Sequence, residues 1–236
     1  MKKRTLSIAE LFESPKEHRG LAGWLAGSLS PYLGKFSPAH LTNSLDFKEK
    51  LQNFSRHHSL NGFRMLSLDV TALFTSVPLE DVLSFIKMKI ESGRVAPPVP
   101  TQEFLELIRL CVENNVFEFN GEYYRQKFGV AMGSPLSPVL AGLYMEYFES
   151  ELLSGLQSQP TLWLRYVDDV FALWPEDQNF DGFLGELNSL SPSIEFTAEW
   201  EVEGKLPFLD VIVNRFNSGF MFDIYRKPTH SHQYLH

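Results

Sequence analysis

The sequence predicts an α+β fold in which an antiparallel sheet is backed by helices. Apolar runs of strand length occur at 63–70, 162–167 and 170–174. Longer segments such as 79–92 and 101–114 space their apolar residues three or four positions apart, as an amphipathic helix does. Strands backed by two or three helices form the layered arrangement of the α+β class.

The helical segments are recognised by one apolar face and by the residues that open them. The segment 79–92 places Val82, Phe85 and Ile86 on one face. A proline-rich loop follows, and Thr101 with its neighbouring acidic residue opens the next helix. We expect helices over 20–33, 43–56, 79–92, 101–114, 135–153 and 178–189.

The strands are bounded by turn signals. In VFEF-NG-EYYR (116–125), the pair Asn120-Gly121 suits a type I′ hairpin turn. Residues 203–207 indicate a turn between two strands of a closing meander. We expect strands over 63–70, 162–167, 170–174, 194–202 and 207–214.

Two adjacent carboxylates, Asp168 and Asp169, lie between the strands 162–167 and 170–174. An acidic turn there would place both carboxylates at one tip, and carboxylate oxygens are hard ligands that suit Mg²⁺. Aspartate is also common in turns for backbone reasons alone, so a plain hairpin turn is equally consistent with this pair.

A third carboxylate, Asp69, ends the strand 63–70. On a neighbouring strand it would meet Asp168 and Asp169. Two-metal phosphoryl transfer needs such a cluster, because two cations about 3.5–4 Å apart must be held against their mutual repulsion. The three acids together favour phosphoryl-transfer chemistry over a simple turn.

The chain resembles the reverse transcriptase domain of Penelope-like retroelements, which are relatives of telomerase and other retroelement polymerases. The similarity runs from about Gly20 to the end, with the blocks in the family's order, and the last block points to this subfamily. The blocks are LSLDVTALFTSVPLEDVL (66–83), FGVAMGSPLSPVLAGLYMEYFE (128–149), LRYVDDVFALW (164–174), LPFLDVIV (206–213) and YRKPTHSHQYL (225–235).

This resemblance implies the palm of a polymerase right hand, with part of the fingers and without a thumb. Residues 1–18 have no match and form a separate segment, and 19–236 would be the fingers and palm region. The family's basic fingers strand, written around Arg-Pro-Ile, has no counterpart here. The chain would be a palm-centred fragment, from either a truncated element or a partial gene model, in which fingers, thumb or nuclease segments are missing.

The implied activity is that of an RNA-directed DNA polymerase, a retroelement reverse transcriptase that extends a DNA primer. Asp69 and Asp168 would bridge two Mg²⁺ ions, with Asp169 supporting the site, and Mn²⁺ could replace Mg²⁺. The partners would be an RNA or DNA template with its DNA primer and deoxynucleoside triphosphates.

The resemblance also implies a nucleotide pocket. Phe74 would pack under the sugar of the incoming nucleotide, and its ring would exclude a 2′-hydroxyl by collision. A core phenylalanine at the start of a helix is the alternative interpretation. Val70 would line the pocket, and the turn Met132, Gly133 and Ser134 would support the template base and the nucleotide.

Basic residues near the end of the chain are candidates for further contacts. By resemblance, Lys205 lies near the residue that protonates the departing pyrophosphate, although an exposed turn lysine is more often only a solvated charge. Arg226 and Lys227 would contact backbone phosphates of the primer–template duplex. We interpret Asp210, within a predicted strand, as structural.

The net charge of −8 argues mildly against a nucleic-acid partner. The acidity is local, because 166–204 contain ten Asp or Glu and no Lys or Arg. The lone Cys111 fits a reducing compartment, and neither a signal peptide nor an apolar run long enough to span a membrane is present. We therefore expect a nuclear or cytoplasmic protein without membrane contact.

Two other functions stay open. The chain could be a catalytically inactive, truncated remnant that acts at most as a nucleic-acid-binding protein. It could also be a metal-dependent phosphodiesterase or nuclease, although Phe74 and the Gly133 turn suit a nucleotide pocket and no histidine adjoins the acids in sequence.

Overall fold

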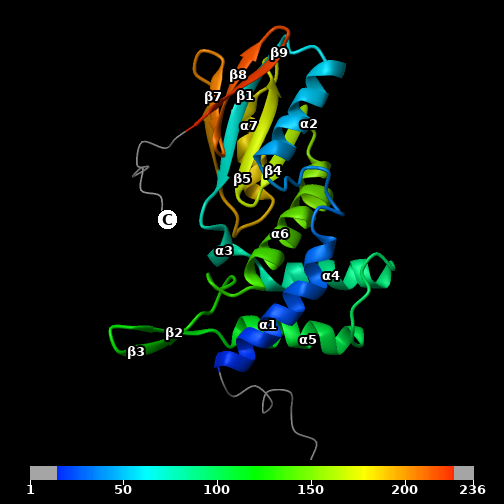
Figure 1. Ribbon diagram of the computed structural model, residues 1–236, viewed down its shortest axis with the longest axis vertical. Coiled ribbons are helices and arrows are strands. Elements are labelled where there is room, and N and C mark those ends of the chain that lie inside the picture. The colour runs from blue at the N-terminus through cyan, green and yellow to red at the C-terminus, as the bar shows by residue number, and fades with distance from the viewer. Residues whose placement is uncertain (1–14, 226–236) are drawn as a thin grey trace, which may run out of the picture. The chain divides into compact units, whose positions relative to one another are not determined.

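The computed structural model describes residues 15–225, which form two compact units (Figure 1). The first unit comprises the described residues up to Pro38, together with Ala72–Ser154 and Ser191–Ile194. The second unit comprises Ala39–Thr71, Gly155–Leu190 and the described residues from Glu195 onward. The chain therefore passes between the units several times, and each unit is built from segments distant in sequence.

The second unit is organised around a four-stranded antiparallel sheet with the order β4-β5-β1-β6. Successive side chains along its strands point alternately to two buried faces. Val170, Ala172 and Trp174 of β5 point to the face covered by helix α7, where Trp174 lies 4.6 Å from the ring of Phe183. The strands are β1 (Phe63–Val70), β4 (Leu162–Tyr166), β5 (Asp169–Pro175) and β6 (Phe196–Trp200), and α7 spans Phe180–Ser189.

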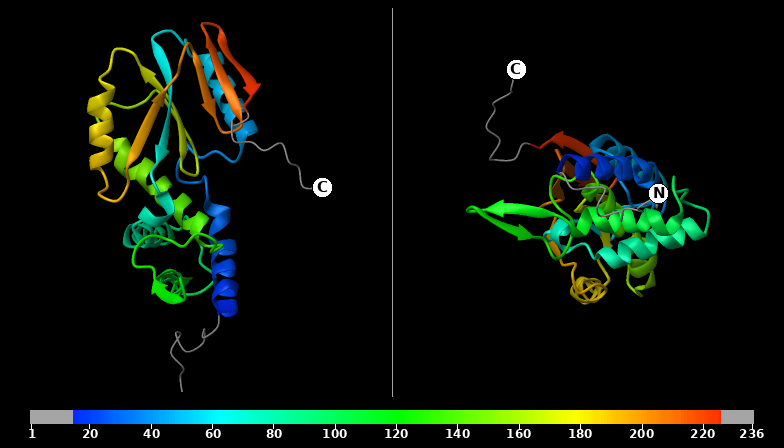
Figure 2. Two further views of the ribbon diagram at one scale, coloured as in Figure 1. Left: turned by 90° about the vertical axis from the view of Figure 1, so that its left-hand side faces the viewer. Right: turned by 90° about the horizontal axis from the view of Figure 1, so that it is seen from below.

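The opposite face of this sheet is covered by helix α2 (Ser44–His57) and by a second, three-stranded sheet (Figure 2, left). Phe47 of α2 packs between Phe171 and Phe208, with ring centroids 5.0 and 4.7 Å away. The second sheet is antiparallel in the order β7-β8-β9, with β7 (Lys205–Phe208), β8 (Val211–Phe216) and β9 (Gly219–Ile224). The strand ends that carry Asp69 and Asp169 thus extend from a buried apolar core.

The first unit is mainly helical. Its apolar interior includes Leu25, Phe85, Phe104 and Leu140, all of them buried. The helices are α1 (Pro15–Leu29), α3 (Leu73–Ser76), α4 (Leu79–Glu91), α5 (Thr101–Glu113) and α6 (Ser137–Tyr147), with a 3-10 turn, η2, at Ser30–Tyr32. The hairpin of β2 (Val116–Phe119) and β3 (Glu122–Arg125) extends away from these helices (Figure 1).

Most expected elements are confirmed within one to a few residues, and the predicted hairpin turn has positive φ at both Asn120 (53°) and Gly121 (79°). The helix expected over 135–153 is different. It stays α-helical only to Tyr147 and continues as a π-helical turn, η3 (Phe148–Leu152), and a 3-10 turn, η4 (Leu153–Gly155). The π turn keeps Phe148 and Leu153, five residues apart, both buried.

The meander was predicted with its turns in the wrong places. Lys205 is the first residue of β7 rather than part of a turn, because the chain reverses at Glu203 and Gly204, whose φ angles are 51° and 72°. The strand expected over 207–214 is interrupted at Leu209 (φ 54°), so Asp210 lies in a turn between β7 and β8 rather than in a strand. Within residues 15–225, no helix has the length and apolar character needed to cross a membrane.

Candidate active site

The β4–β5 hairpin ends in a two-residue turn that carries the first candidate carboxylate. Tyr166 pairs with Asp169, so Val167 and Asp168 form the turn. Val167 has a φ of 55°, in the left-handed region that a β-branched side chain rarely adopts. Such conformations cost on the order of 1–3 kcal/mol and persist where the surroundings impose them.

A buried arginine next to the turn holds the carbonyl group of Val167. Arg165 has no solvent exposure, and its Nη1 donates to the carbonyl oxygen of Val167 at 3.1 Å. The Arg165 backbone N–H also donates to the carbonyl of Ala39, and its carbonyl accepts from the N–H of Leu41, both at 2.7 Å. The Arg165 side chain therefore holds the turn, and the segment before α2 holds the Arg165 backbone.

Asp69 and Asp169 are brought together by strand register. Asp69 on β1 lies directly opposite Asp169 on β5 and opposite Thr197 on β6. Side chains directly opposite in an antiparallel pair share a face with Cβ atoms about 4.5–5.5 Å apart. The N–H of Val70 donates to the carbonyl of Asp168 at 3.2 Å, which ties the turn to the end of β1.

These two aspartates line a cavity of about 280 Å³ within the second unit. Thr197 and Glu199 of β6 form one wall of it, and Phe208, Leu209 and Tyr225 contribute apolar and aromatic surface on the side of the second sheet. Sequence reasoning missed Glu199. Its signal was the alternation along FTAEW, which places Thr197 and Glu199 on the same face.

The carboxylates affect one another electrostatically. Burial raises the pKa of Asp69 above its ordinary value, and the negative charges of Asp168 and then Glu199 raise it further. Ionised carboxylates that repel one another are stabilised by a cation placed between them.

The donor set is therefore of the hard, anionic kind that suits Mg²⁺ or Mn²⁺. Asp69, Asp168 and Asp169 would hold such ions. Within residues 15–225, however, no three His, Cys, Asp or Glu side chains are already gathered into a metal-binding arrangement.

The predicted nucleotide-pocket residues Phe74, Met132, Gly133 and Ser134 all lie in the first unit. Phe74, on α3, is half-buried, and Met132 is exposed. Gly133 has a φ of 92°, which requires glycine, in the turn before α6. As predicted, a proline, Pro138, lies in the first turn of that helix.

A glycine that sequence reasoning did not single out holds Phe74 against this loop. The N–H of Val130 donates to the carbonyl of Phe74 at 2.6 Å. A Cβ at Gly129 would lie 2.4 Å from the carbonyl carbon of Thr75, so only glycine permits this approach. Phe74 and the loop before α6 are therefore one local structure.

The remaining predicted residues lie apart from the acidic cavity or outside the description. Val70, the last residue of β1, is buried. Lys205 is exposed and pairs with Asn214, and it does not line the cavity that contains Asp69. Arg226 and Lys227 lie outside the described residues.

Known proteins resemble the chain in sequence and in fold. Residues 29–201 match the family model described as reverse transcriptase (RNA-dependent DNA polymerase). Telomerase reverse transcriptase of Rattus norvegicus is 28% identical over 159 residues, which cover 67% of this chain and 11% of that protein.

Solved telomerase structures share the fold. Telomerase from Candida albicans, in complex with a TWJ fragment of telomeric RNA, has a TM-score of 0.69 at 13% identity, covering 94% of this chain and 42% of that one. Apo telomerase from Candida tropicalis, truncated from its C-terminal domain, has a TM-score of 0.62 at 14% identity, covering 92% and 47%. The predicted α+β class and polymerase right-hand fold are confirmed. Because the matching model covers most of the chain, the chain belongs to the reverse transcriptase (RNA-dependent DNA polymerase) family.

Proposed function

We propose that this chain is the catalytic palm region of an RNA-directed DNA polymerase that extends a DNA primer with deoxynucleotides and releases pyrophosphate. One observation carries the proposal. Strand register sets Asp69 against Asp169 at the ends of the two central strands of a buried sheet, and Asp168 in the adjoining turn is close enough to raise the pKa of Asp69. Family membership supplies the reaction class.

Asp69 and Asp168 would hold two Mg²⁺ ions, and Asp169 would support them; Mn²⁺ is an alternative ion. When bound, the ions supply Lewis acidity that lowers the pKa of the primer 3′-hydroxyl and neutralises charge on the triphosphate. The residues of the chain orient the carboxylates. Arg165 holds the Val167 carbonyl and so fixes the turn that presents Asp168.

The proposed nucleotide-binding residues are Phe74, Met132, Gly133 and Ser134, with Val70 contributing through its backbone. Phe74 selects deoxynucleotides by excluding a 2′-hydroxyl. Half-burial leaves part of its ring accessible, and the close packing of Gly129 fixes its position. Lys205 as a proton donor and Arg226 and Lys227 as duplex contacts remain part of the proposal.

We propose RNA or DNA as the template and a Penelope-like retroelement as the origin, with residues 19–236 as the fingers and palm region. The telomerase neighbour that carries an RNA fragment supports a nucleic-acid template. The tail YRKPTHSHQYL supports the subfamily. The chain spans 11% of the length of its telomerase relative.

A second candidate is an inactive remnant that binds nucleic acid without catalysis. It is favoured by the lack of a preformed metal-binding group of three among residues 15–225. The two candidates differ in their dependence on a divalent metal ion, because catalysis needs the ion and binding of nucleic acid alone does not.

The test is extension of a labelled DNA primer on an RNA template by the purified chain with deoxynucleotides, in Mg²⁺, in Mn²⁺ and with a chelator. We expect metal-dependent extension in steps of one nucleotide. Binding without extension would support the remnant. Shortening of the primer or template would support a nuclease, and neither binding nor extension would overturn the proposal.

A further inference from the structure

Phe74 lies on a helical turn that is too short to fix its own position. α3 contains only four residues, and helices this short are not stable in water by themselves. Ala72, which precedes the turn, has a φ of 51°, in the left-handed region that alanine rarely adopts. Two hydrogen bonds from Thr75 to the Ala72 carbonyl oxygen, at 3.1 Å from the N–H and 3.0 Å from the hydroxyl, close the turn. The position of Phe74 therefore depends on contacts from outside α3.

The backbone carbonyl of Phe74 takes its hydrogen bond from another part of the first unit. In a longer helix this carbonyl would accept from the N–H four residues further on, but that residue is Pro78, which has no N–H. The N–H of Val130 donates instead, at 2.6 Å. Val130 is 1% exposed, so without this bond its N–H would be buried and unsatisfied. The segment before α6 thus supplies the contact that α3 lacks.

Gly129 allows the two segments to come this close. Its φ is 70°, and a Cβ there would lie 2.5 Å from both the carbonyl oxygen of Phe74 and the Cα of Thr75. Ordinary van der Waals contact begins at 3.4 Å, so a larger residue would push the two backbones apart by about 0.9 Å. The crowded atoms belong to the backbone, and no side-chain rotation relieves the overlap. A side chain in place of Gly129 therefore displaces either its own segment or α3.

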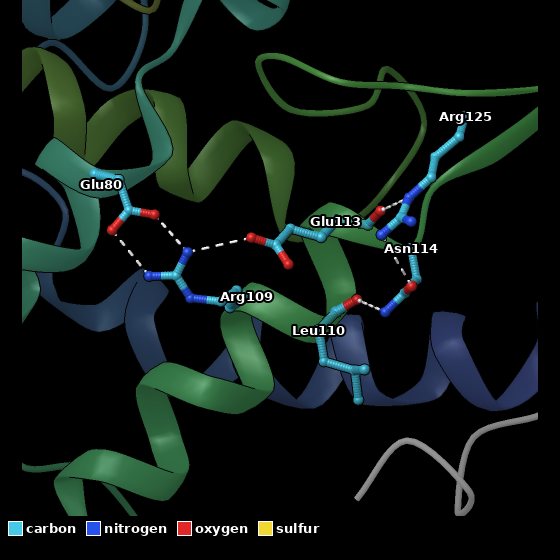
Figure 3. Close-up of polar contacts among 6 residues, drawn as sticks. All are labelled: Glu80, Arg109, Leu110, Glu113, Asn114 and Arg125. Carbon is cyan, nitrogen blue, oxygen red and sulfur yellow. Dashed lines mark hydrogen bonds and ion pairs between the residues drawn. The ribbon is translucent and has the colours of Figure 1, made fainter.

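The segments on either side of this contact are anchored to α5 (Figure 3). Arg125, four residues before Gly129, donates through Nε to the carbonyl of Glu113 at 2.8 Å. Arg109 donates to both carboxylate oxygens of Glu80, which lies in the first turn of α4. Because these neighbours are held on one helix, the single turn of α3 is the part that would move.

We propose that Gly129 is a positioning residue for sugar selection, because it lets the Val130 N–H hold the Phe74 backbone at the place where the ring excludes a 2′-hydroxyl. This inference rests on the proposed role of Phe74. Exclusion by collision works only where the colliding group is fixed, and groups in a binding site have to be held within about 0.5 Å. A displacement of about 0.9 Å exceeds that tolerance. The selectivity therefore depends both on the ring and on the glycine that positions it.

The test measures equilibrium binding of a deoxynucleoside triphosphate and of the matching ribonucleoside triphosphate in Mg²⁺. The chain is bound to an RNA template with a primer that ends in a dideoxynucleotide, so no 3′-hydroxyl is present and no reaction follows. The variants are Gly129→Ala, Phe74→Ala and the double variant. Gly93→Ala is the matched control, because Gly93 has a φ of 72° but a Cβ there would meet nothing within 4 Å. It places alanine in the same backbone conformation without the crowding.

We expect Gly129→Ala to reduce the preference for the deoxynucleotide about fivefold or more, and Gly93→Ala to leave it within about twofold of wild type. Because Gly129 acts through the ring, the double variant should show the same preference as Phe74→Ala instead of a further loss. A glycine that only supported the fold would, when replaced, weaken binding of both nucleotides equally.

Amide hydrogen exchange reports the contact itself without any nucleotide. The Val130 amide should exchange slowly in the wild type and in Gly93→Ala, and faster in Gly129→Ala. Circular dichroism melting checks that each variant folds. Thr75→Val is a second variant of the same turn, since it removes the hydroxyl bond to Ala72 without adding a crowded atom. It should reduce the deoxynucleotide preference about twofold.

An unchanged preference in folded Gly129→Ala, a double variant that adds to the loss in Phe74→Ala, or a wild-type Val130 amide that exchanges freely would overturn this assignment. If Gly129→Ala does not fold, an unchanged preference in Thr75→Val has the same meaning. A wild type that binds no nucleotide, or binds both sugars equally, would also overturn it.

The two proposals fail separately, because binding is measured without chemistry. Primer extension by a chain whose sugar preference is independent of Gly129 would overturn only this inference. A Gly129-dependent preference in a chain that cannot extend a primer with a 3′-hydroxyl would overturn only the polymerase activity.

Discussion

The acidic residues illustrate what a side chain's neighbours add to its sequence position. Asp69, Asp168 and Asp169 were identified from their places at strand ends, and the register confirms that two of them face each other. Glu199 and Arg165 were not identified, because their roles arise from pairing across strands. The left-handed backbone conformation of Val167 could not be predicted from the sequence, because β-branched residues such as valine rarely adopt it.

Replacing Phe74 by alanine should relax sugar selection. The ring is half-buried on α3 and held there by the loop at Gly129. Without it, ribonucleotide incorporation relative to deoxynucleotide incorporation should rise by about 10-fold or more. Competition assays between each ribonucleotide and the matching deoxynucleotide measure this ratio. Phe216→Ala, which removes an exposed ring from β8, is the control. An unchanged ratio would assign Phe74 to the apolar interior alone.

Asp69→Asn should stabilise the metal-free protein slightly at neutral pH. The folded-state pKa of Asp69 is raised, first by burial and then by Asp168 and Glu199. The stability that its protonated form contributes is therefore complete below the unfolded value near 3.8 and is lost as pH rises through the folded value.

The variant should melt above wild type at pH 7, by no more than about 2 °C because the carboxylate is only partly shielded from water, and the difference should vanish as the pH falls toward 3.8. Asp177→Asn, in the turn at the other end of β5, is the control. A lower melting temperature at pH 7 would contradict this sign.

At the scale of elements, local patterns predicted most helices and strands because their apolar periodicity is written in consecutive residues. They failed where the backbone departs from a regular period. The π turn after Tyr147 preserves the apolar pattern while changing the hydrogen bonds. The turn at Leu209 lies inside a run that reads as one strand.

One ion pair joins the two sheets of the second unit. Arg215 of β8 donates through Nε to both oxygens of Glu201, at 3.2 and 3.0 Å, and through Nη2 to Oε1. Hydrogen bonding to Glu201 raises the pKa of Arg215. The Glu201 side chain is only 4% exposed, and its N–H donates to the carbonyl of Met65 on β1.

Arg215→Met should therefore lower the free energy of unfolding of the second unit by about 3 kcal/mol, because it leaves a buried carboxylate without its partner. Lys87→Met breaks an exposed pair with Glu91 and should cost less than about 0.5 kcal/mol. Urea unfolding followed by tryptophan fluorescence compares them. Equal losses would show that the Glu201–Arg215 pair contributes no more than a surface contact.

At the scale of the whole molecule, the fold class followed from the sequence but the division into units did not. The units interleave, since Ala72–Ser154 and Ser191–Ile194 join one unit while the segments between and after them join the other. No composition change marks these crossings. The predicted site residues consequently fall in both units, with the carboxylates in the second and Phe74 and the Gly133 turn in the first.

The charge of the chain is unevenly distributed along its sequence. The chain carries a net charge of −8, with its acidic stretch at 166–204 around the carboxylates of the second unit. Divalent ions held by Asp69, Asp168 and Asp169 would reduce the repulsion among these carboxylates. The exposed cations Arg125 and Lys127 lie in the first unit.

The most direct measurement is the rate of RNA-templated primer extension in Mg²⁺ for the wild type, for Asp168→Ala and for the exposed-turn control Asp177→Asn. We expect extension by the wild type and by Asp177→Asn. A folded Asp168→Ala protein should lose about 10³-fold or more of the rate, because positioning and charge stabilisation supply most of the catalysis. Extension at the wild-type rate by that folded variant would contradict the assignment of Asp69, Asp168 and Asp169 as the catalytic centre.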